Sequence, residues 1–384
     1  MSAGARPRAC AECLRRASLI GYLAGHIEKA VDRTPGSRAH EVLALSDEDL
    51  TRAMARSRAD HFLERAASLD HEEVRAALIA AQAWACCRHH SLYPSSLRDL
   101  GDPPAVLFGR GRPKLLESLS ADGAVTIVGS RRPSGHGREL ARTLGRELAS
   151  AGLVVVSGMA MGIDCCAHEG ALEAGGSTVA VLGTGVDLPY PPRCGHLYER
   201  LVERGLVLSE LPLGATARRW TFPARNRIMA AIGAITVVVE ARERSGSLIT
   251  AEMAEDLGRE VGAVPGRVGS SPAVGTNGLL RDGASVIRGA QDVLDSMLGP
   301  GAGARTAGVV PRGPVLEPDL IELLELLESG SSGADALARA SGLEPGQLAS
   351  ALLRLELSGY VHSDSAGRYE RTTLALPEPV RPPH

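Results

Sequence analysis

Residues 124–137 read AVTIVGSRRPSGHG, and this stretch decides the fold class of the chain. An apolar run over 124–128 leads into a turn of glycine, serine and two arginines, which is typical of a buried strand that ends at a phosphate-binding turn. The turn matches neither the dinucleotide motif G-x-G-x-x-G nor the triphosphate motif G-x-x-x-x-G-K-[ST], because its glycines are Gly129, Gly135 and Gly137. The stretch therefore predicts a strand and an anion-binding turn, and leaves open which phosphate compound binds there.

Short apolar runs alternate with helical stretches across the region that surrounds this turn. The runs are at 124–129, 152–158, 177–183, 205–210, 234–240 and 260–266. They are unbroken rather than alternating, as expected for parallel strands that are covered on both faces. The region therefore predicts an α/β fold, a doubly wound and mostly parallel sheet.

The flanking segments predict smaller modules. Residues 1–90 show helical spacing and a helix cap at Ser46, but no group of residues that suggests a functional site. The end of the chain predicts three short helices and a hairpin, which together make a winged helix. We expect a helical N-terminal module at 1–90, a connector at 91–120, the sheet domain at 121–298, a Gly/Pro linker at 299–314, a winged helix at 315–374 and a disordered tail at 375–384. The expected recognition helix carries only Arg354, so we expect it to read duplex DNA poorly.

The composition excludes a global basic field. The chain has 384 residues, 44% hydrophobic and 23% charged, with a formal net charge of −3. Any nucleic-acid site must therefore be a local patch. No apolar run is long enough to span a membrane, and the N-terminus lacks the apolar core of a signal peptide, so we expect a cytoplasmic protein.

The cysteines allow two interpretations. Cys10 and Cys13 form a C-x-x-C pair, and Cys86-Cys87 precede His89 and His90. A zinc site built from these residues is one interpretation, but a second spaced pair is lacking, which favours buried or unused thiols. We expect no bound metal and no cofactor.

Glycine and serine follow nearly every predicted strand. Several anion sites along one sheet edge suit a chain of phosphates better than one nucleotide, although each turn alone also fits a tight strand-to-helix connection. The segment 217–234, ARRWTFPARNRIMAAIGA, places Trp220 and Phe222 between arginines. Guanidinium groups on phosphates with rings on bases are typical of single-stranded nucleic-acid binding. The alternative is that both rings are core anchors and the arginines form surface ion pairs.

A catalytic set is not apparent. Asp164 and His168 lie one helical turn apart, which fits acid–base chemistry or ordinary capping and packing. The chain has no G-x-S-x-G motif, and no metal-ligand cluster is evident in the sequence. An alternative function is a nucleotide-processing enzyme of the lysine-decarboxylase-like (phosphoribohydrolase) Rossmann group, with Glu240 and Glu252 near the sheet edge. A winged-helix transcription regulator is disfavoured by the acidic helices.

Seven stretches between about 93 and 290 resemble the DNA-processing DprA (Smf) family in order and spacing. They are YPSSLRDLGDPPAVLFGRG, VGSRRPSGHG, VVSGMAMGIDCCAHEGAL, GSTVAVLGTGVDLPYPP, SELPLG, FPARNRIMAAIGAITVVVEARERSGSLITAEMAEDLGREVGAVPG and GTNGLLRDGA. The resemblance implies an extended Rossmann-like domain that binds and protects single-stranded DNA. It implies a non-enzymatic homodimer that loads the RecA recombinase in natural transformation and recombination. Departures are Met159, Met161 and the MAAIGA that follows NRI; none removes an expected contact.

The resemblance also implies roles for individual residues. Arg131 would grip the DNA backbone, Arg219 would contact DNA where the family has a basic residue, and Phe222 would stack on a base. Arg132 is expected to be a solvated neighbour of smaller effect. The other residues expected in the groove, by motif or by strand-end position, are Gly129, Ser130, Ser134, Ser157, Gly158, Arg225, Asn226, Arg227, Ser245, Gly246 and Ser247.

Overall fold

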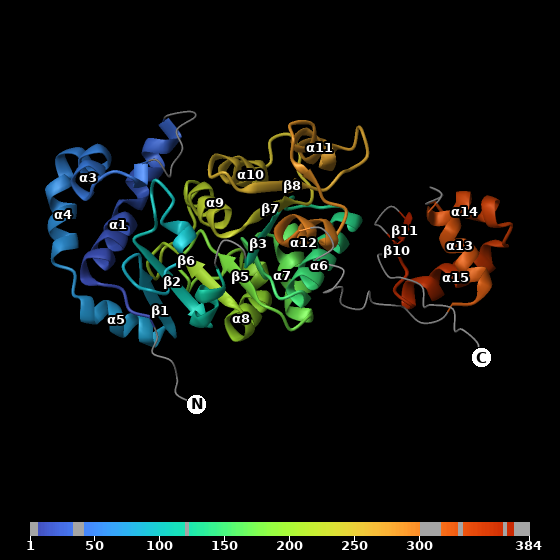
Figure 1. Cartoon of the computed structure of the whole chain (residues 1–384), viewed down its shortest axis with the longest axis horizontal. Coiled ribbons are helices and arrows are strands. Elements are labelled where there is room, and N and C mark those ends of the chain that lie inside the picture. Colours follow the sequence, from blue (N-terminus) through green and yellow to red (C-terminus); the bar gives the residue numbers. More distant parts are fainter. Residues whose placement is uncertain are drawn as a thin grey trace.

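The computed structural model describes residues 7–33, 42–119, 123–299, 316–328, 333–363 and 367–371. Its centre is a sheet of nine strands in the order β1-β2-β6-β5-β4-β3-β7-β8-β9 (Figure 1). The strands are β1 (Ala83–Cys87), β2 (Val106–Gly111), β3 (Ala124–Val128), β4 (Val154–Ser157), β5 (Thr178–Val181), β6 (Leu206–Ser209), β7 (Ile235–Val238), β8 (Glu260–Ala263) and β9 (Ser285–Val286). The order runs outward from β3 in both directions, so the sheet is doubly wound, as predicted.

The apolar runs that predicted strands all form strands, β3 to β8. Every pairing between β6 and β9 in the sheet order is parallel. The residues of β3 to β7 are buried along their whole length, as coverage of both faces requires. The prediction of a mostly parallel α/β sheet is confirmed.

The prediction that residues 1–90 are all helical is wrong at 83–87. These residues form β1, which pairs antiparallel with β2, and β2 pairs antiparallel with β6. Trp84 and Cys86 enter the core on one face of the sheet, while Ala85 and Cys87 enter the core on the other face. Burial on both faces favours a strand over a half-exposed helix. The predicted connector at 91–120 likewise contains β2, so the sheet begins near residue 83 rather than 121.

Helices make up most of the other described residues of the N-terminal region, as predicted. Its helices are α1 (Ala11–Arg33), α3 (Asp47–Ala55), α4 (Ala59–Ala67) and α5 (His71–Ala80). The Ser46 side chain accepts from the Asp49 N–H, which confirms the predicted cap. Leu23, Ile27 and Phe62 of this module form a buried cluster with Trp220, so the module is packed onto the sheet domain rather than tethered to it.

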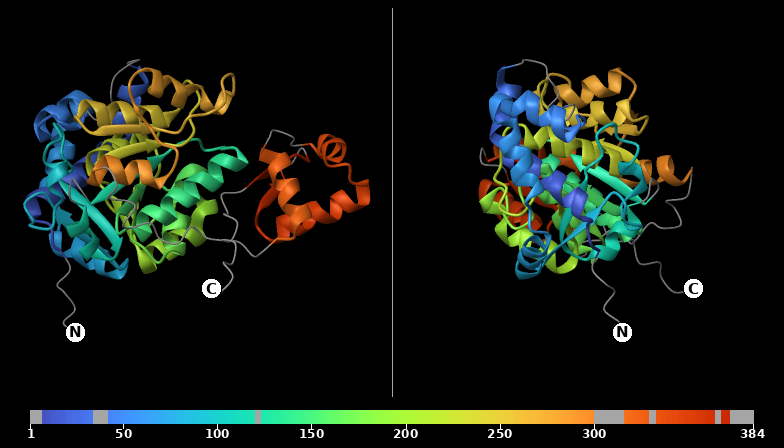
Figure 2. Two further views of the ribbon diagram at one scale, coloured as in Figure 1. Left: turned by 45° about the vertical axis from the view of Figure 1, so that its right-hand side comes forward. Right: turned by 90° about the vertical axis from the view of Figure 1, so that its left-hand side faces the viewer.

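Helices cover both faces of the sheet, which makes a three-layer domain (Figure 2). One face is covered by α6 (Gly135–Ser150), α7 (Ile163–Glu173) and α12 (Ala290–Leu298). The other face is covered by α9 (Thr221–Ile232) and α10 (Gly246–Asp256). The remaining helices of this domain are α8 (Gly195–Arg204) and α11 (Val274–Arg281).

The C-terminal region is a winged helix, as predicted. It comprises α13 (Pro318–Glu328), α14 (Ala334–Ser341), α15 (Pro345–Leu357), β10 (Val361–Ser363) and β11 (Tyr369–Arg371). Leucines of its helices and Tyr360 form a separate core. Residues 300–314 of the predicted linker and the predicted tail at 375–384 lie outside the described residues. Among the helices of the described ranges, none is long and apolar enough to cross a membrane.

Trp220 is expected to fix the N-terminal module on the sheet domain. Its ring is 2% exposed and its Nε1–H donates to the Ala24 carbonyl of α1 at 3.0 Å. Replacing Trp220 with Ala should destabilise this contact by about 3–5 kcal/mol, because it leaves a cavity and an orphaned carbonyl. Hydrogen exchange should then accelerate in α1, α3 and α4 and remain unchanged in the winged helix.

Trp220→Phe is the matched control, because it keeps most of the buried area and loses only the hydrogen bond. It should accelerate exchange much less than Trp220→Ala. Equal exchange in both variants would contradict the proposed role of the buried area.

Candidate nucleic-acid interface

A cavity of about 670 Å³ opens at the carboxyl edge of the sheet. It lies where β3 separates the two directions of the sheet order, the point at which doubly wound sheets bind ligands. The loop after β3, the loops after β4 and β7, and the N-terminal ends of α9 and α10 form its walls. Its lining residues are Val128, Gly129, Ser130, Arg131, Arg132, Ala160, Asp164, Arg219, Phe222, Pro223, Arg225, Asn226, Met229, Arg242, Arg244, Ser245, Gly246, Ser247, Ile249 and Thr250.

The lining is strongly basic. Its arginines come from three segments that are distant in sequence, and Asp164 is the acidic side chain among the lining residues. The Arg219 side chain is 86% exposed, and its guanidinium lies 3.6 Å from the Asp32 carboxylate. A surface pair of this kind contributes little, so Arg219 can turn toward an anionic ligand at low cost.

Phe222 lies at the rim of the cavity, between a cation and a second ring. The Arg131 guanidinium carbon is 5.6 Å from the centroid of the Phe222 ring, and the Tyr190 ring is 5.5 Å from it. Phe222 is half-buried, whereas Trp220 is buried in the contact with α1. Trp220 is thus a core anchor, as the alternative interpretation of segment 217–234 proposed for both rings. Phe222 instead presents its ring at the cavity.

Arg225 is part of the floor of the cavity, and its side chain is buried rather than projecting into solvent. Its guanidinium donates to the carbonyls of Gly158 and Val181, at the ends of β4 and β5. A Cβ on Gly158 would lie 2.0 Å from the guanidinium, so glycine is needed there for this contact and not for a ligand. Burial lowers the pKa of Arg225 to about 10, which leaves it charged at neutral pH, with Asp164 opposing the shift.

The N-terminus of α6 is already occupied by a carboxylate of the protein. The Ser134 N–H and hydroxyl donate to the two oxygens of Glu240, at 3.0 and 2.5 Å, and Ser134 also caps the Gly137 N–H. A Cβ on Gly137 would lie 2.4 Å from Glu240 Oε1. The Glu240 carboxylate therefore occupies the position at Ser134 where a phosphate was predicted to bind.

The N-terminus of α10 faces the cavity instead. Ser245 caps this helix, and Ser245, Gly246 and Ser247 all line the cavity beside Arg242 and Arg244. Unpaired helix N–H groups next to two guanidinium groups form a favourable environment for an anion.

Four predicted site residues are not in the cavity lining: Ser134, Ser157, Gly158 and Arg227. Ser157 is fully buried and its hydroxyl donates to the Ile127 carbonyl, so it joins β4 to β3. Arg227 is 3% exposed and its guanidinium pairs with Asp102 and Glu210, both at 2.7 Å. Arg227 extends to the other side of α9, toward the segment that precedes β2.

The Asp164 and His168 pair is structural. Asp164 accepts from the N–H groups of Gly158 and Ala160, at 3.1 and 3.3 Å, and so caps the loop after β4. His168 is fully buried against the Thr178 hydroxyl, and burial lowers its pKa to about 3. A histidine held neutral and away from solvent does not serve as an acid–base group, so the capping interpretation is the correct one.

Sequence reasoning missed Arg242 and Arg244 in the cavity lining, and Tyr190 beside the Phe222 ring. Arg242 and Arg244 directly follow β7, and the strand-end rule that identified Ser245 would have identified them as well. Tyr190 lies 32 positions before Phe222 in the sequence, and no local signal links the two rings. Arg132, expected to be a solvated neighbour, is exposed but does line the cavity.

The fold and the cavity define a Rossmann-like protein with an arginine-lined groove at the switch point of its sheet. A family model described as DNA recombination-mediator protein A matches residues 84–298, and one described as the DprA winged helix domain matches residues 310–367. The first model alone covers more than half of the chain. The chain belongs to the DNA-processing DprA (Smf) family, as its sequence motifs predicted.

Relatives and solved structures agree with this assignment. The "Putative DNA processing protein DprA" of Mycobacterium tuberculosis is 39% identical over 68% of this chain and 67% of its own length. "Protein Smf" of Synechocystis is 35% identical over 73% of this chain and 78% of its own. The X-ray structure of DprA from Streptococcus pneumoniae has a TM-score of 0.59 at 32% identity, over 75% of this chain and 98% of that one.

A second solved structure concerns "the unique single-stranded DNA binding mode of DNA processing protein A from Helicobacter pylori". It matches with a TM-score of 0.51 at 32% identity, over 56% of this chain and 96% of that one. At this level of identity the likeness extends beyond fold to the family.

Replacing Arg227 with Met should destabilise the sheet domain by about 3–5 kcal/mol, because Asp102 and Glu210 would be left buried without a cation. Burial already raises the pKa of Asp102 to about 6, against the attraction of Arg227. In the variant the folded state should hold the proton on the Asp102 carboxyl to still higher pH. The loss of stability should therefore be largest near pH 8 and shrink as the pH falls toward 5.

Urea unfolding of both proteins across this pH range measures the effect. Arg288→Met, at an exposed arginine outside the cavity that pairs with Asp292, is the control and should shift the unfolding curve much less. A destabilisation of Arg227→Met that does not vary with pH would contradict the role of the two carboxyls.

Proposed function

We propose that this chain binds single-stranded DNA in the arginine-lined cavity, without base preference. Arg131, Arg219, Arg242 and Arg244 would bind successive phosphates, and the Phe222 ring would stack on a base. The observation that carries the proposal is the half-buried Phe222 ring with Arg131 at 5.6 Å on the rim of a basic cavity. Ring faces and guanidinium groups together bind single strands independently of sequence.

The residues beneath the cavity support the proposal indirectly. Gly158, Asp164 and Arg225 would shape the floor, because Asp164 accepts from the Gly158 N–H and Arg225 donates to the Gly158 carbonyl. Gly129, Ser130, Asn226, Ser245, Gly246 and Ser247 line the cavity and remain proposed contacts. The structure of the relative from Helicobacter pylori is described by its single-stranded DNA binding mode, which supports the proposal.

The proposed role is binding rather than catalysis. The enzyme alternative relied on Glu240 and Glu252 near the sheet edge, but Glu240 accepts from Ser134, and Glu252 is not among the residues that line the cavity. Both oxygens of Glu240 accept from Ser134 at the start of α6. Incubation with nucleoside monophosphates, followed by chromatography, tests the point, and release of free base would contradict it.

The wider role that we propose follows from family membership. The chain would act in the cytoplasm as a homodimer that protects incoming single strands and loads the RecA recombinase onto them during transformation and recombination. The winged helix fits a partner or self-association module better than a duplex reader, because Arg354 of α15 pairs with Glu317 at 2.9 Å. Its first helix, α13, is acidic.

Arg131→Ala should weaken binding to a single-stranded oligonucleotide by about 10- to 150-fold, since a hydrogen bond to a charged group contributes about 1.5–3 kcal/mol. The salt dependence should fall by about 0.7 in the logarithmic slope, the loss of one phosphate contact. Arg132→Ala should have a much smaller effect. Fluorescence anisotropy across a salt series measures both, and tight binding by Arg131→Ala would exclude the proposed site.

Phe222→Leu should weaken binding by about 5- to 150-fold, because stacking of one base contributes about 1–3 kcal/mol, while the salt slope stays unchanged. Phe62→Leu is the matched control, since Phe62 is buried in the helical module away from the cavity. It should leave the affinity unchanged. An unchanged affinity of Phe222→Leu would rule out stacking at this ring.

A further inference from the structure

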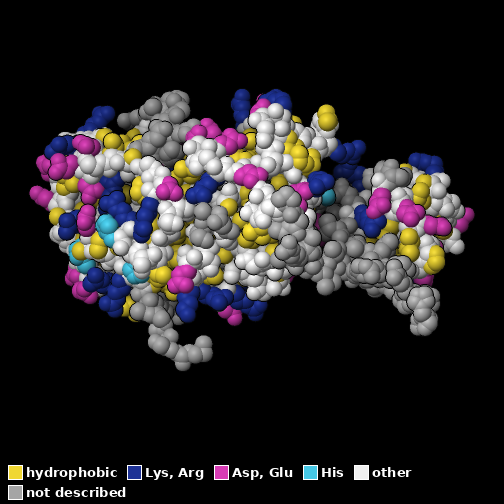
Figure 3. Space-filling model, viewed as in Figure 1, with side chains coloured by type: hydrophobic (Ala, Val, Ile, Leu, Met, Phe, Trp, Pro, Cys, Tyr) yellow, Lys and Arg dark blue, Asp and Glu magenta, His cyan; other side chains and the backbone are white. Residues whose placement is uncertain are grey.

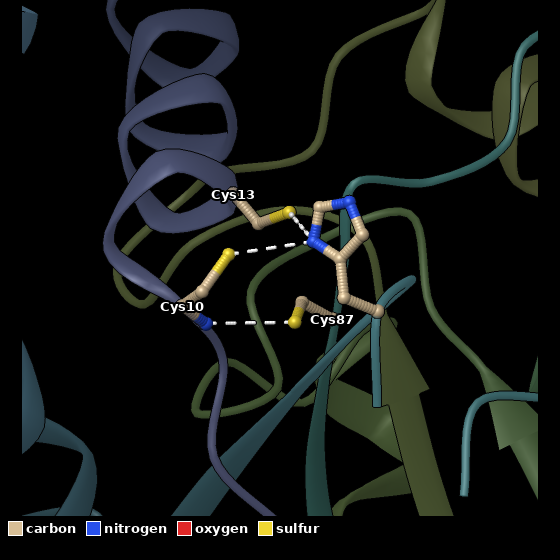
Figure 4. Close-up of side chains that lie close together, drawn as sticks. Cys10, Cys13 and Cys87 are labelled. Carbon is tan, nitrogen blue, oxygen red and sulfur yellow. Dashed lines mark hydrogen bonds between the residues drawn. The ribbon is translucent and has the colours of Figure 1, made fainter. Parts of the chain in front are cut away.

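Four metal-binding side chains come together at a distance from the cavity, and DNA binding gives them no role. Cys10 precedes α1, Cys13 lies in its first turn, Cys87 ends β1, and His89 follows two residues later. The ligand atoms of the four all lie within 4.8 Å of one another. Figure 4 shows the three sulfurs and the imidazole ring pointing toward one another from the start of α1 and the end of β1.

The distances fit tetrahedral coordination. Nδ1 of His89 lies 3.5 Å from the sulfurs of both Cys10 and Cys13. Zinc–sulfur bonds of about 2.3 Å and zinc–nitrogen bonds of about 2.0 Å in a tetrahedron separate sulfur from nitrogen by about 3.5 Å. One ring nitrogen has a single proton or a single lone pair, so it cannot satisfy two thiols by hydrogen bonding alone.

A backbone N–H group and a helix end lie beside the sulfurs. The Cys10 N–H donates to the Cys87 sulfur at 3.4 Å, the kind of outer contact that steadies a metal-bound thiolate. The N-terminal end of α1, where Cys13 lies, carries a partial positive charge that favours negatively charged ligands. Cys13 and Cys87 are buried and His89 is exposed, which gives an ion access from solvent.

We propose that Cys10, Cys13, Cys87 and His89 bind one zinc ion. Three thiolates and one imidazole are a ligand set that zinc binds in structural sites, where the protein fills all four positions. The lack of a second spaced pair, which favoured unused thiols, does not apply to the folded chain: Cys87 and His89 supply the second pair across the sheet edge. The proposed zinc site therefore replaces the expectation that the chain binds no metal.

The ion would join two elements that are distant in sequence. Cys10 and His89 are 79 positions apart, and between them lie the helices of the N-terminal module. Closing a segment of this length restricts the unfolded chain, and metal binding adds directly to folding free energy. The site would thereby hold the first turn of α1 against β1, whose edge carries no further strand in the sheet order.

The test uses the full chain, purified under reducing conditions without chelator. Elemental analysis should find one zinc per chain. Cys13→Ser and Cys87→Ser should each lower zinc affinity by more than about tenfold, since even outer contacts of a metal ligand account for that much. Cys194→Ser is the matched control: its sulfur lies 3.1 Å from that of Cys165, outside this cluster, and its loss should leave the zinc content at one.

A second measurement does not depend on the variants folding. Cobalt added to the chelator-stripped wild-type chain should give the visible bands of a tetrahedral site and a thiolate charge-transfer band, both removed by one equivalent of zinc. Absence of zinc together with absence of these bands would overturn the proposal. A Cys10–Cys13 disulfide in the reduced preparation, or equal zinc loss in Cys194→Ser, would also overturn it.

Discussion

The buried guanidinium of Arg225 is the contact on which the cavity depends. It joins α9 to the ends of two adjacent strands through the carbonyls of Gly158 and Val181. Gly158 directly follows β4 and Val181 is the last residue of β5, and buried carbonyls at such strand ends need hydrogen-bond partners. By satisfying them, Arg225 fixes the first turn of α9, and with it the position of Phe222 one turn earlier. The same buried charge adds to the positive potential of the cavity above it.

The basic character of the cavity also depends on where the acidic side chains are engaged. Glu240 is held at the start of α6, Glu210 and Asp102 pair with Arg227, and Glu28 pairs with Arg218. On the face in Figure 3, acidic and basic side chains are interspersed rather than separated. A net charge of −3 is thus compatible with an anion site, because internal pairing removes carboxylates from the sheet edge where they would repel phosphate.

The parallel strands could be predicted because burial on both faces leaves a continuous apolar run. β1 could not, since the sequence AWACC continues the alanine-rich style of the helix before it, and only its pairing with β2 makes it a strand. At the site, Arg225 and Arg227 look equivalent in sequence. They are two positions apart on a helix and therefore point in directions about 200° apart, so one reaches the strand ends and the other a buried pair with Glu210. The sequence shows the helical spacing of the two arginines but not which groups each guanidinium contacts.

The N-terminal module contributes to the position of the cavity residues, because α1 contacts the segment that leads into Phe222. α1 has 23 residues, about 34 Å of continuous helix, with Cys13 in its first turn and Glu28 near its end. Glu28 accepts from the Arg219 N–H and from the Arg218 guanidinium, and Ala24 accepts from Trp220. These contacts set the backbone that leads into Phe222. A rigid helix fixed at both ends constrains that backbone more tightly than a helix fixed at one end, so an anchor at Cys10 and Cys13 would steady the proposed stacking position from the far side of the module.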